Sequence, residues 1–406
     1  MRLDYGKTFT LGLGFMAISM TWSVYNAFVP VFYERFVQSG ALIGLLMTTD
    51  NIIGVTLQPW VAHRSDRTWT RLGRRMPYIL LGAPAGALLF ALIPFHTGLW
   101  MLLVAALGMN LATGLYRAPA VALMPDITPR PVRSQANGII NLMGGAGGVA
   151  AFFIAAPLFR TAEHLPFTVT AATALLAVAV LYWRIREPRH LAGEENARGI
   201  SFTAAVRSLF QLQRRSVLYL LLAIFAWFVG HQGIEAFFTL YAINVLGVDA
   251  AAGALTLGFF AVAFLAFAVP AGFLAGRLGR KNLIRAGLTL LLLVFAAAFG
   301  VRSVQVVRVL FLVAGLAWAL VNVNAYPTLV EMASDAETGT YTGLYYFFSS
   351  AAAVAGPPLM GLLRDLFGYE YLFLYAGIPL AAALLLMGRV RGGEAVAPSR
   401  GEEPAP

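Results

Sequence analysis

The feature that most constrains this chain is a succession of apolar runs, each near 20 residues long, that continues along the whole sequence. A helix of about 20 residues crosses a bilayer core of about 30 Å. Hydrophobic residues make up 59% of the chain and charged residues only 12%, whereas soluble proteins carry about 25% charged residues. The sequence therefore predicts an all-α polytopic membrane protein, because lipid offers no hydrogen-bond partners to an open backbone.

Hydropathy and polar breaks divide the chain into twelve predicted transmembrane helices. Their ranges are 9–33, 42–62, 78–95, 99–122, 134–158, 166–184, 216–245, 250–275, 283–300, 306–330, 340–363 and 370–388. The first run, from Phe9 to Phe32, is longer than the apolar core of a signal peptide. We therefore expect it to remain as the first membrane span.

The distribution of positive charge predicts the orientation in the membrane. A net charge of +10 would suggest nucleic acid in a soluble protein, but the arginines here lie mostly in short loops between apolar runs. Cytoplasmic loops carry the excess of Lys and Arg, and the arginine-rich loops predict that both termini are cytoplasmic, in the inner (plasma) membrane. We expect no nucleic-acid partner. The absence of cysteine excludes disulfides and thiol chemistry.

The two halves of the chain repeat each other. Asp126 lies 205 residues before Glu331, and Trp22 lies 205 residues before Trp227. A duplication of six spans is typical of secondary transporters whose substrate site lies at the midplane between halves. The predicted parts are an N-terminal six-helix bundle (1–184), a cytoplasmic linker (185–215), a C-terminal six-helix bundle (216–390) and a disordered tail (391–406).

The loop after the second span resembles the G-x-x-x-D-R-x-G-R-R signature of the major facilitator superfamily. This first copy has Ala62 at the glycine position and four extra residues, 68–71; the second copy keeps Gly272 but has Gly276 where the signature has Asp. The resemblance implies two six-helix bundles that rock about a central site. It also implies a cytoplasmic gate, for which we predict Asp66, Arg67, Arg74, Arg75, Asp126, Arg277, Arg280 and Glu331.

Two stretches show a narrower resemblance. Gln58-Pro59, Ser65-Asp66-Arg67 with the following RLGRRMPYILLG, and the segment Tyr116 to Gly138 are similar to the sucrose–proton symporters and the related glycoside–pentoside–hexuronide cation symporters. This resemblance implies a sugar substrate. The plant sucrose symporters carry a protonatable Asp and an Arg in span 4, where this chain has Asn110 and Val121. The coupling chemistry of that subgroup therefore does not transfer to this chain.

Charged residues inside the predicted spans indicate a functional interior. Asp50, Arg117 and Glu235 are such residues. A charge at mid-bilayer costs about 2.5–3.5 kcal/mol, so charged residues there usually line a cavity or pathway. We predict Asp50 and Glu235 as cation-coupling residues. The alternatives are a solvated Asp50 in the outer part of its span and an Arg117 that snorkels to the interface.

Polar and aromatic residues at helical spacing predict the substrate site. Trp227, His231 and Glu235 follow each other at i, i+4 and i+8 and share one helical face. An aromatic ring beside hydrogen-bonding groups suits a sugar, although such a face also suits a polar contact between helices. The predicted substrate-binding residues are Trp22, Tyr25, Asn26, Gln58, Asn110, Arg117, Trp227, His231, Glu235, Asn322 and Tyr345.

The glycine cluster 144–148 is not a phosphate-binding loop, because it lies in an apolar helix where small residues permit close packing. We expect no ATP site, catalytic residue, metal site or cofactor, so an ion or substrate gradient must supply the energy. The predicted function is proton-coupled symport of a sugar, a disaccharide or glycoside, by a monomer in the lipid bilayer. The alternatives are sodium coupling, or export of amphipathic drugs or metabolites, which would require an apolar cavity.

Overall fold

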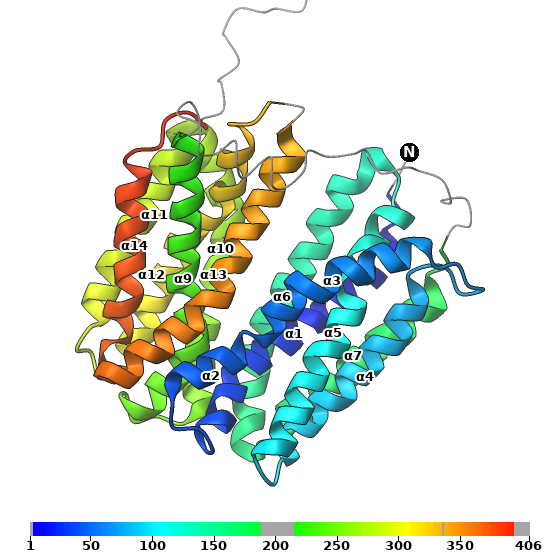
Figure 1. The fold of residues 1–406 in the computed structure, drawn as a ribbon, viewed down its shortest axis with the longest axis horizontal. Helices are drawn as coiled ribbons and strands as arrows, with labels where there is room; N and C mark the ends of the chain where they lie inside the picture. Colours follow the sequence, from blue (N-terminus) through cyan, green and yellow to red (C-terminus); the bar gives the residue numbers. More distant parts are fainter. Residues whose placement is uncertain (1–2, 188–214, 335–336, 394–406) are drawn as a thin grey trace, which may run out of the picture.

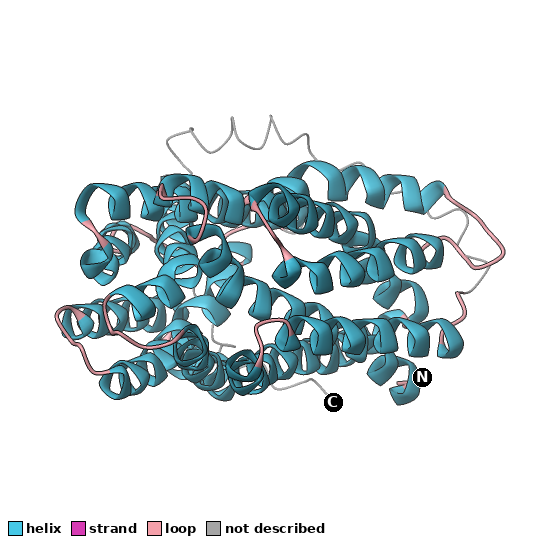
Figure 2. Ribbon diagram, turned by 90° about the horizontal axis from the view of Figure 1, so that it is seen from below, coloured by secondary structure: helices cyan, strands magenta, loops and turns pink. Residues whose placement is uncertain are grey.

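The computed structural model describes residues 3–187, 215–334 and 337–393. Within these ranges, twelve segments are long and apolar enough to cross a membrane. They are α1 (Tyr5–Glu34), α2 (Gly40–Met47) with α3 (Thr49–Arg67), α4 (Met76–Leu92) with η1 (Ile93–Phe95), α5 (Leu99–Ile127), α6 (Arg133–Thr161), α7 (Leu165–Arg184), α9 (Arg215–Asn244), α10 (Ala250–Leu278), α11 (Arg280–Ala298), α12 (Val304–Val330), α13 (Thr338–Phe367) and η5 (Tyr369–Tyr371) with α14 (Leu372–Met387). A short turn, η2 (Arg130–Val132), precedes α6. The predicted all-α fold with twelve spans is confirmed, and Figure 2 shows the described chain as helices joined by loops.

Several helices are longer than the apolar runs that predicted them, because polar residues continue the helix beyond the apolar segment. The second span, predicted to end at residue 62, continues through five polar residues to Arg67, and the fourth span, predicted to end at residue 122, continues to Ile127. The second span starts at Gly40, where the Ser39 side chain accepts a hydrogen bond from the Leu42 amide at 3.3 Å. It is interrupted at Thr48 and then runs to Arg67.

The helices form two bundles that lie side by side, α1–α7 and α9–α14 (Figure 1). Most of the predicted linker and tail, 188–214 and 394–406, lies outside the described residues. We call the end of the molecule that carries Asp4, the loop 68–75 and Arg389 the terminal end. The opposite end, with the loops 35–39 and 245–249, is the distal end. In Figure 1 the two bundles meet at the distal end and separate toward the terminal end.

Glycines let helices approach closely at two places. A Cβ atom on Gly147 of α6 would overlap the backbone of Met16 in α1, which confirms the packing role predicted for the glycines of span 5. At the distal end, a Cβ atom on Gly361 of α13 would overlap the backbone of Gly40 in α2. Small residues permit such backbone contacts between membrane helices. The two halves therefore touch backbone to backbone at the distal end.

The first helix of each half is largely buried. The buried share of the spanning segment is 50% for α1 and 56% for α9. Because α1 and α9 pack against each other across the two halves, polar side chains on these helices lie between the bundles. This arrangement positions the candidate site.

Candidate functional site

A hydrogen bond at the centre of the molecule joins the two halves. Asn26 of α1 donates from Nδ2 to Oε1 of Glu235 in α9 at 2.9 Å. Glu235 also lies one helical turn from His231, with 3.8 Å between Nδ1 of His231 and Oε2 of Glu235. A carboxylate between the halves can therefore exchange one of its partners when the halves move.

A polar cavity of about 520 Å³ lies beside this bond. The predicted residues that line it are Trp22, Asn26, Asp50, Arg117 and Glu235. The guanidinium carbon of Arg117 lies 6.0 Å from the centre of the Trp22 ring, and Asn51 donates to Asp50 at 2.9 Å. The structure thus brings the three charged residues of the spans to one cavity, as expected from the cost of burying them in lipid.

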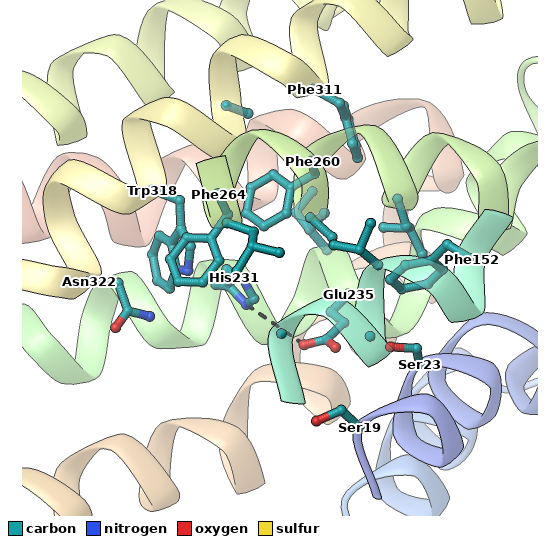
Figure 3. A pocket seen from close by; sticks show the side chains of 18 of the residues that line it. Ser19, Ser23, Phe152, His231, Glu235, Phe260, Phe264, Phe311, Trp318 and Asn322 are labelled. Atoms are coloured by element: carbon teal, nitrogen blue, oxygen red, sulfur yellow. Dashed lines mark ion pairs between the residues drawn. The ribbon is translucent and has the colours of Figure 1, made fainter. Parts of the chain in front are cut away.

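A second cavity, of about 330 Å³, lies mostly within the second half and is shown in Figure 3. Its wall is mostly apolar, and Phe260, Phe264, Phe311, Trp318 and Phe152 are among its lining residues. His231 stacks on Trp318 with a distance of 4.2 Å between ring centres, and Asn322 lies beside Trp318 (Figure 3). Two predicted polar residues, His231 and Asn322, therefore sit in a wall that is mostly apolar.

Glu235 lies where the two cavities adjoin. Ser19, Ser23 and Glu235 line both cavities, and Figure 3 shows the two serines of α1 across from the Glu235 carboxylate. Among the residues that the structure describes, no group of three His, Asp or Glu side chains is placed to hold a metal ion. Glu235 thus shares the polar cavity with Asp50 and Arg117 and the second cavity with His231.

Tyr25 and Asn110 line neither cavity. Both are buried, and Asn110 donates from Nδ2 to the Tyr25 hydroxyl at 3.3 Å and to Thr49 Oγ1 at 2.9 Å. These bonds join α5 to α1 and α3 within the first half. In this conformation the two residues form a polar contact between helices.

Three further predicted residues also lie away from both cavities. Trp227 is fully buried in the hydrophobic core, one helical turn before His231, which lines the second cavity. Tyr345 is buried, and its ring lies 5.3 Å from that of Tyr326. Gln58 is half-buried on α3. Helical spacing predicts which side of a helix these side chains occupy. It does not predict how far along the helix the cavity extends.

At the terminal end, gate residues of the first half form one cluster. Arg74 donates to Asp126 from Nε at 3.0 Å and from Nη2 at 2.5 Å, and Arg75 donates to the same carboxylate at 3.0 Å. Arg75 also donates to Asp66. The Glu187 carboxylate accepts from the backbone amides of both arginines, at distances between 2.8 and 3.1 Å. The loop is therefore fixed to its own bundle.

In the second copy of the gate, Arg280 lies 2.9 Å from Glu331, and Arg277 is exposed near the end of α10. Arg67, which belongs to the first copy, is exposed at the end of α3. Each of these ion pairs, in both copies, joins residues of the same half. The bundles are separated at the terminal end, so these ion pairs do not cross between them. In this conformation the predicted gate residues stabilise each bundle by itself.

At the distal end, contacts do cross between the halves. Asp365 of α13 accepts hydrogen bonds from the Ser39 hydroxyl at 3.0 Å, the Gly40 amide at 2.6 Å and the Ala41 amide at 3.0 Å. These amides are at the start of α2 and have no partner within the helix. A carboxylate of the second half therefore caps a helix of the first half.

Two further ionic contacts close the distal end. Glu34 of α1 accepts from the Tyr369 hydroxyl and, at 3.3 Å, from Arg364 of the second half. Arg160 of α6 donates to Asp249, the N-cap residue of α10, at 2.7 and 3.1 Å. The hydrogen bonds from Arg160 hold the pKa of the Asp249 carboxyl below its ordinary value. These contacts open only if the halves separate at this end.

Several lining residues were missed from the sequence. They are the aromatic residues of the second cavity, the amides Asn51, Asn141 and Gln232, and Ser19 and Ser23. Phe and Trp in an apolar span look the same whether they face lipid or a cavity. The serines had a signal, because Ser19, Ser23 and Asn26 follow helical spacing on one face of span 1.

Comparison with known proteins gives one family match. The family described as Major Facilitator Superfamily matches residues 11–350, with a second match over 246–406. Among solved structures, a bacterial homolog to the human lysosomal transporter Spinster, in an inward-facing and occupied conformation, aligns with a TM-score of 0.76 at 17% sequence identity. The alignment covers 94% of this chain and 96% of that one. At this identity the likeness concerns the fold.

Curated relatives include both drug-resistance and sugar-transport proteins. The class D tetracycline resistance protein of Salmonella ordonez is 29% identical over 79% of each chain. The isoprimeverose transporter of Lactiplantibacillus pentosus is 23% identical over 71% of this chain and 63% of its own length, which is less than two thirds. A sucrose transport protein of Arabidopsis thaliana is 23% identical over 33% of this chain and 30% of its own.

Proposed function

This chain belongs to the Major Facilitator Superfamily, and from this premise we propose that it imports a sugar or glycoside by proton-coupled symport. Members of the family are secondary transporters, so the chain is a multi-pass membrane transporter and not an enzyme. The substrate is a small molecule. The sugar, the proton and the direction of transport are our proposals.

The hydrogen bond between Asn26 and Glu235 carries this proposal. Alternating access requires the two halves to rock about a central site, and this bond connects them there. Protonation of Glu235 removes the negative charge that holds Asn26, and a sugar hydroxyl can then take the place of either partner. Proton and sugar are coupled because each changes the free energy of the same contact between the halves.

The polar cavity supports a sugar as the substrate. Its volume of about 520 Å³ falls in the usual range for small-molecule sites, about 300–1,000 Å³. Trp22 offers a flat apolar surface, while Asn51, Asn141 and Gln232 offer amide donors and acceptors. A sugar ring needs both kinds of partner. Asp50 is the second proton-binding residue that we propose.

The positive-inside rule supports an orientation with both termini in the cytoplasm. The terminal end, with its arginine-rich segment 64–75 at the end of α3 and in the loop that follows, then faces the cytoplasm and the distal end faces outward. In this orientation the conformation described here is closed outward and separated on the cytoplasmic side, ready to release a substrate and a proton inward.

Uptake into proteoliposomes tests the function. Labelled sucrose, maltose and glucose are offered under an imposed proton gradient and, separately, a sodium gradient. We expect accumulation of at least one sugar with the proton gradient and none with sodium alone. Accumulation driven only by sodium would replace the proton, and no accumulation of any sugar under either gradient would remove the symport hypothesis.

Carboxamide variants test the coupling residue. Glu235→Gln should abolish accumulation against a gradient while equilibrium exchange of sugar continues, because the amide cannot carry a proton. Asp50→Asn tests the second carboxylate in the same way. Glu163→Gln is the control, since this exposed carboxylate pairs with Arg35 far from the cavities. Full accumulation by both Glu235→Gln and Asp50→Asn would exclude the two residues from coupling.

The second cavity favours one other function. An exporter of amphipathic drugs requires an apolar site, and Phe260, Phe264 and Trp318 provide one. The relative at 29% identity is a tetracycline resistance protein. Expression in a drug-sensitive bacterium separates the two hypotheses: raised resistance to tetracycline that Phe264→Asn abolishes, without sugar uptake, would replace import by export.

A further inference from the structure

One face of α3 at the terminal end is basic and aromatic. Trp60, His63, Arg64 and Arg67 follow each other at i, i+3, i+4 and i+7, which places them on one side of the helix. Together with Thr68 they line a concavity of about 280 Å³. The Trp60 side chain is 59% exposed. We call these four residues the α3 basic face.

The α3 basic face is not used to hold the bundle together. The packing side of α3 carries Val61 and Ser65, which are buried, and Ile53 and Leu57, which contact α5 at Gly114. By contrast, Arg64 and Arg67 are exposed, and within the described residues neither guanidinium group pairs with an acidic side chain. Two positive charges at the end of a membrane span thus remain available to an external anion.

The position of the face along the span indicates what that anion is. Trp60 is of a residue type that is enriched where the hydrocarbon core meets the headgroups. Toward the centre of the membrane, α3 exposes apolar side chains, Ile52 at 39% and Val55 at 49%. A ligand at this place therefore meets apolar surface on one side and two arginines on the other. A phospholipid matches both, because its acyl chains are apolar and its phosphate carries a negative charge.

We propose that the α3 basic face binds the headgroup of an anionic phospholipid. The phosphodiester accepts hydrogen bonds from Arg64 and Arg67, since guanidinium groups match the geometry of phosphate oxygens. The Trp60 ring lies at the level of the glycerol backbone, and the acyl chains follow the exposed apolar side of α3. This site is independent of the transported substrate, because it lies outside both cavities.

Native mass spectrometry of the purified full chain tests the proposal. The protein is titrated with dioleoyl phosphatidylglycerol and, separately, with dioleoyl phosphatidylcholine, which has the same chains and no net charge. We expect tighter binding of phosphatidylglycerol. The double variant Arg64→Gln/Arg67→Gln should weaken the affinity for phosphatidylglycerol about thirtyfold. Each arginine near a charged surface contributes about fivefold, and the two factors multiply.

A matched control separates the site from general charge. Arg71→Gln/Arg277→Gln removes two arginines at the same end but off the α3 basic face, and should leave phosphatidylglycerol binding unchanged. Arg64→Lys/Arg67→Lys keeps the charge and should retain binding within about fivefold. These side chains are exposed, so the melting temperature of the variants should match that of the unchanged protein.

Three results would overturn the proposal. Equal binding of the two lipids would show that charge plays no part. Unchanged affinity in Arg64→Gln/Arg67→Gln would place the lipid elsewhere. Displacement of phosphatidylglycerol by millimolar inorganic phosphate would mean that the face takes a free phosphate and not a lipid headgroup.

Discussion

The two ends of this molecule use ion pairs in different ways. At the terminal end, Arg75 joins Asp66 and Asp126 within the first bundle, and Arg280 joins Glu331 within the second. At the distal end, Asp365 reaches from the second bundle to the start of α2 in the first. One end has charges that stabilise each half, and the other has charges that connect the halves.

Ion pairs at the two ends should therefore affect different properties: the free energy of unfolding at the terminal end, and the equilibrium between arrangements of the halves at the distal end. A contact inside one bundle is present whichever way the halves rock, so its loss lowers the free energy of unfolding. A contact between bundles exists in only one arrangement, so its loss shifts the equilibrium between arrangements.

A single introduced cysteine can report this equilibrium. The chain contains no cysteine, and Ser23 is on the wall of both cavities. Labelling of Ser23→Cys therefore measures access to the cavities from the distal end.

Arg75→Ala should have the largest effect, and it should act on stability. The Arg75 side chain is 5% exposed and bridges two carboxylates, and removing one partner of a buried pair costs about 3–5 kcal/mol. Glu331→Ala should cost about 1 kcal/mol or less, because the Glu331 side chain is 42% exposed in its pair with Arg280. Thermal unfolding in nanodiscs measures both, and equal shifts in melting temperature would contradict the difference between the two copies.

Gly44→Leu should prevent closure at the distal end without unfolding either bundle. A side chain at Gly44 would overlap the backbone of Pro357 in α13, and overpacking costs about 1–3 kcal/mol. Labelling of Ser23→Cys by a membrane-impermeant maleimide from the distal side should rise at least fivefold. Gly276→Leu is the control, since no atom of the described residues lies within 4 Å of its Cβ position. Unchanged labelling in Gly44→Leu would mean that this contact does not decide closure.

Asp365→Ala should shift the same equilibrium by less. The substitution leaves the Gly40 and Ala41 amides without their acceptor, and loss of a helix cap costs about 0.5–2 kcal/mol. Labelling of Ser23→Cys should rise about twofold to thirtyfold, and Asp365→Asn should recover part of the closure. A lower melting temperature with unchanged labelling would show that the cap stabilises one bundle only.

Arg160→Gln should have the smallest effect. Arg160 and Asp249 are 53% and 52% exposed, and exposed pairs contribute about 0.2–1 kcal/mol. Because the pKa of Asp249 is lowered in the closed arrangement, the contribution is present above its ordinary pKa and is lost as pH falls through the lowered value. The difference that Arg160→Gln makes to the distances between spin labels on the two bundles should therefore stay constant from pH 5 to 8. A transition inside that window would assign control of closure to another group.

Much of the fold followed from the sequence, since a bilayer permits few structures. Apolar runs of sufficient length must form helices, so the twelve spans were predicted, with errors mainly at ends such as Arg67, where polar residues extend α3 beyond its apolar run. In the candidate site, Asp50, Arg117 and Glu235 were predicted to face a cavity because a charge in lipid is costly. Trp227 and Tyr345 carry no such penalty, and their side chains pack equally well in a core.

The sequence by itself determined the number of spans, the internal repeat and the residues that lipid excludes. The tertiary structure alone decided that Asn26 meets Glu235 across the halves and that an aromatic cavity adjoins the polar one. It also decided that the terminal ion pairs stay within their bundles. Local sequence sets which side of a helix is polar. The partner of a side chain across the bundle interface depends instead on how far the two helices are shifted and rotated against each other. No single segment of the sequence encodes that shift and rotation.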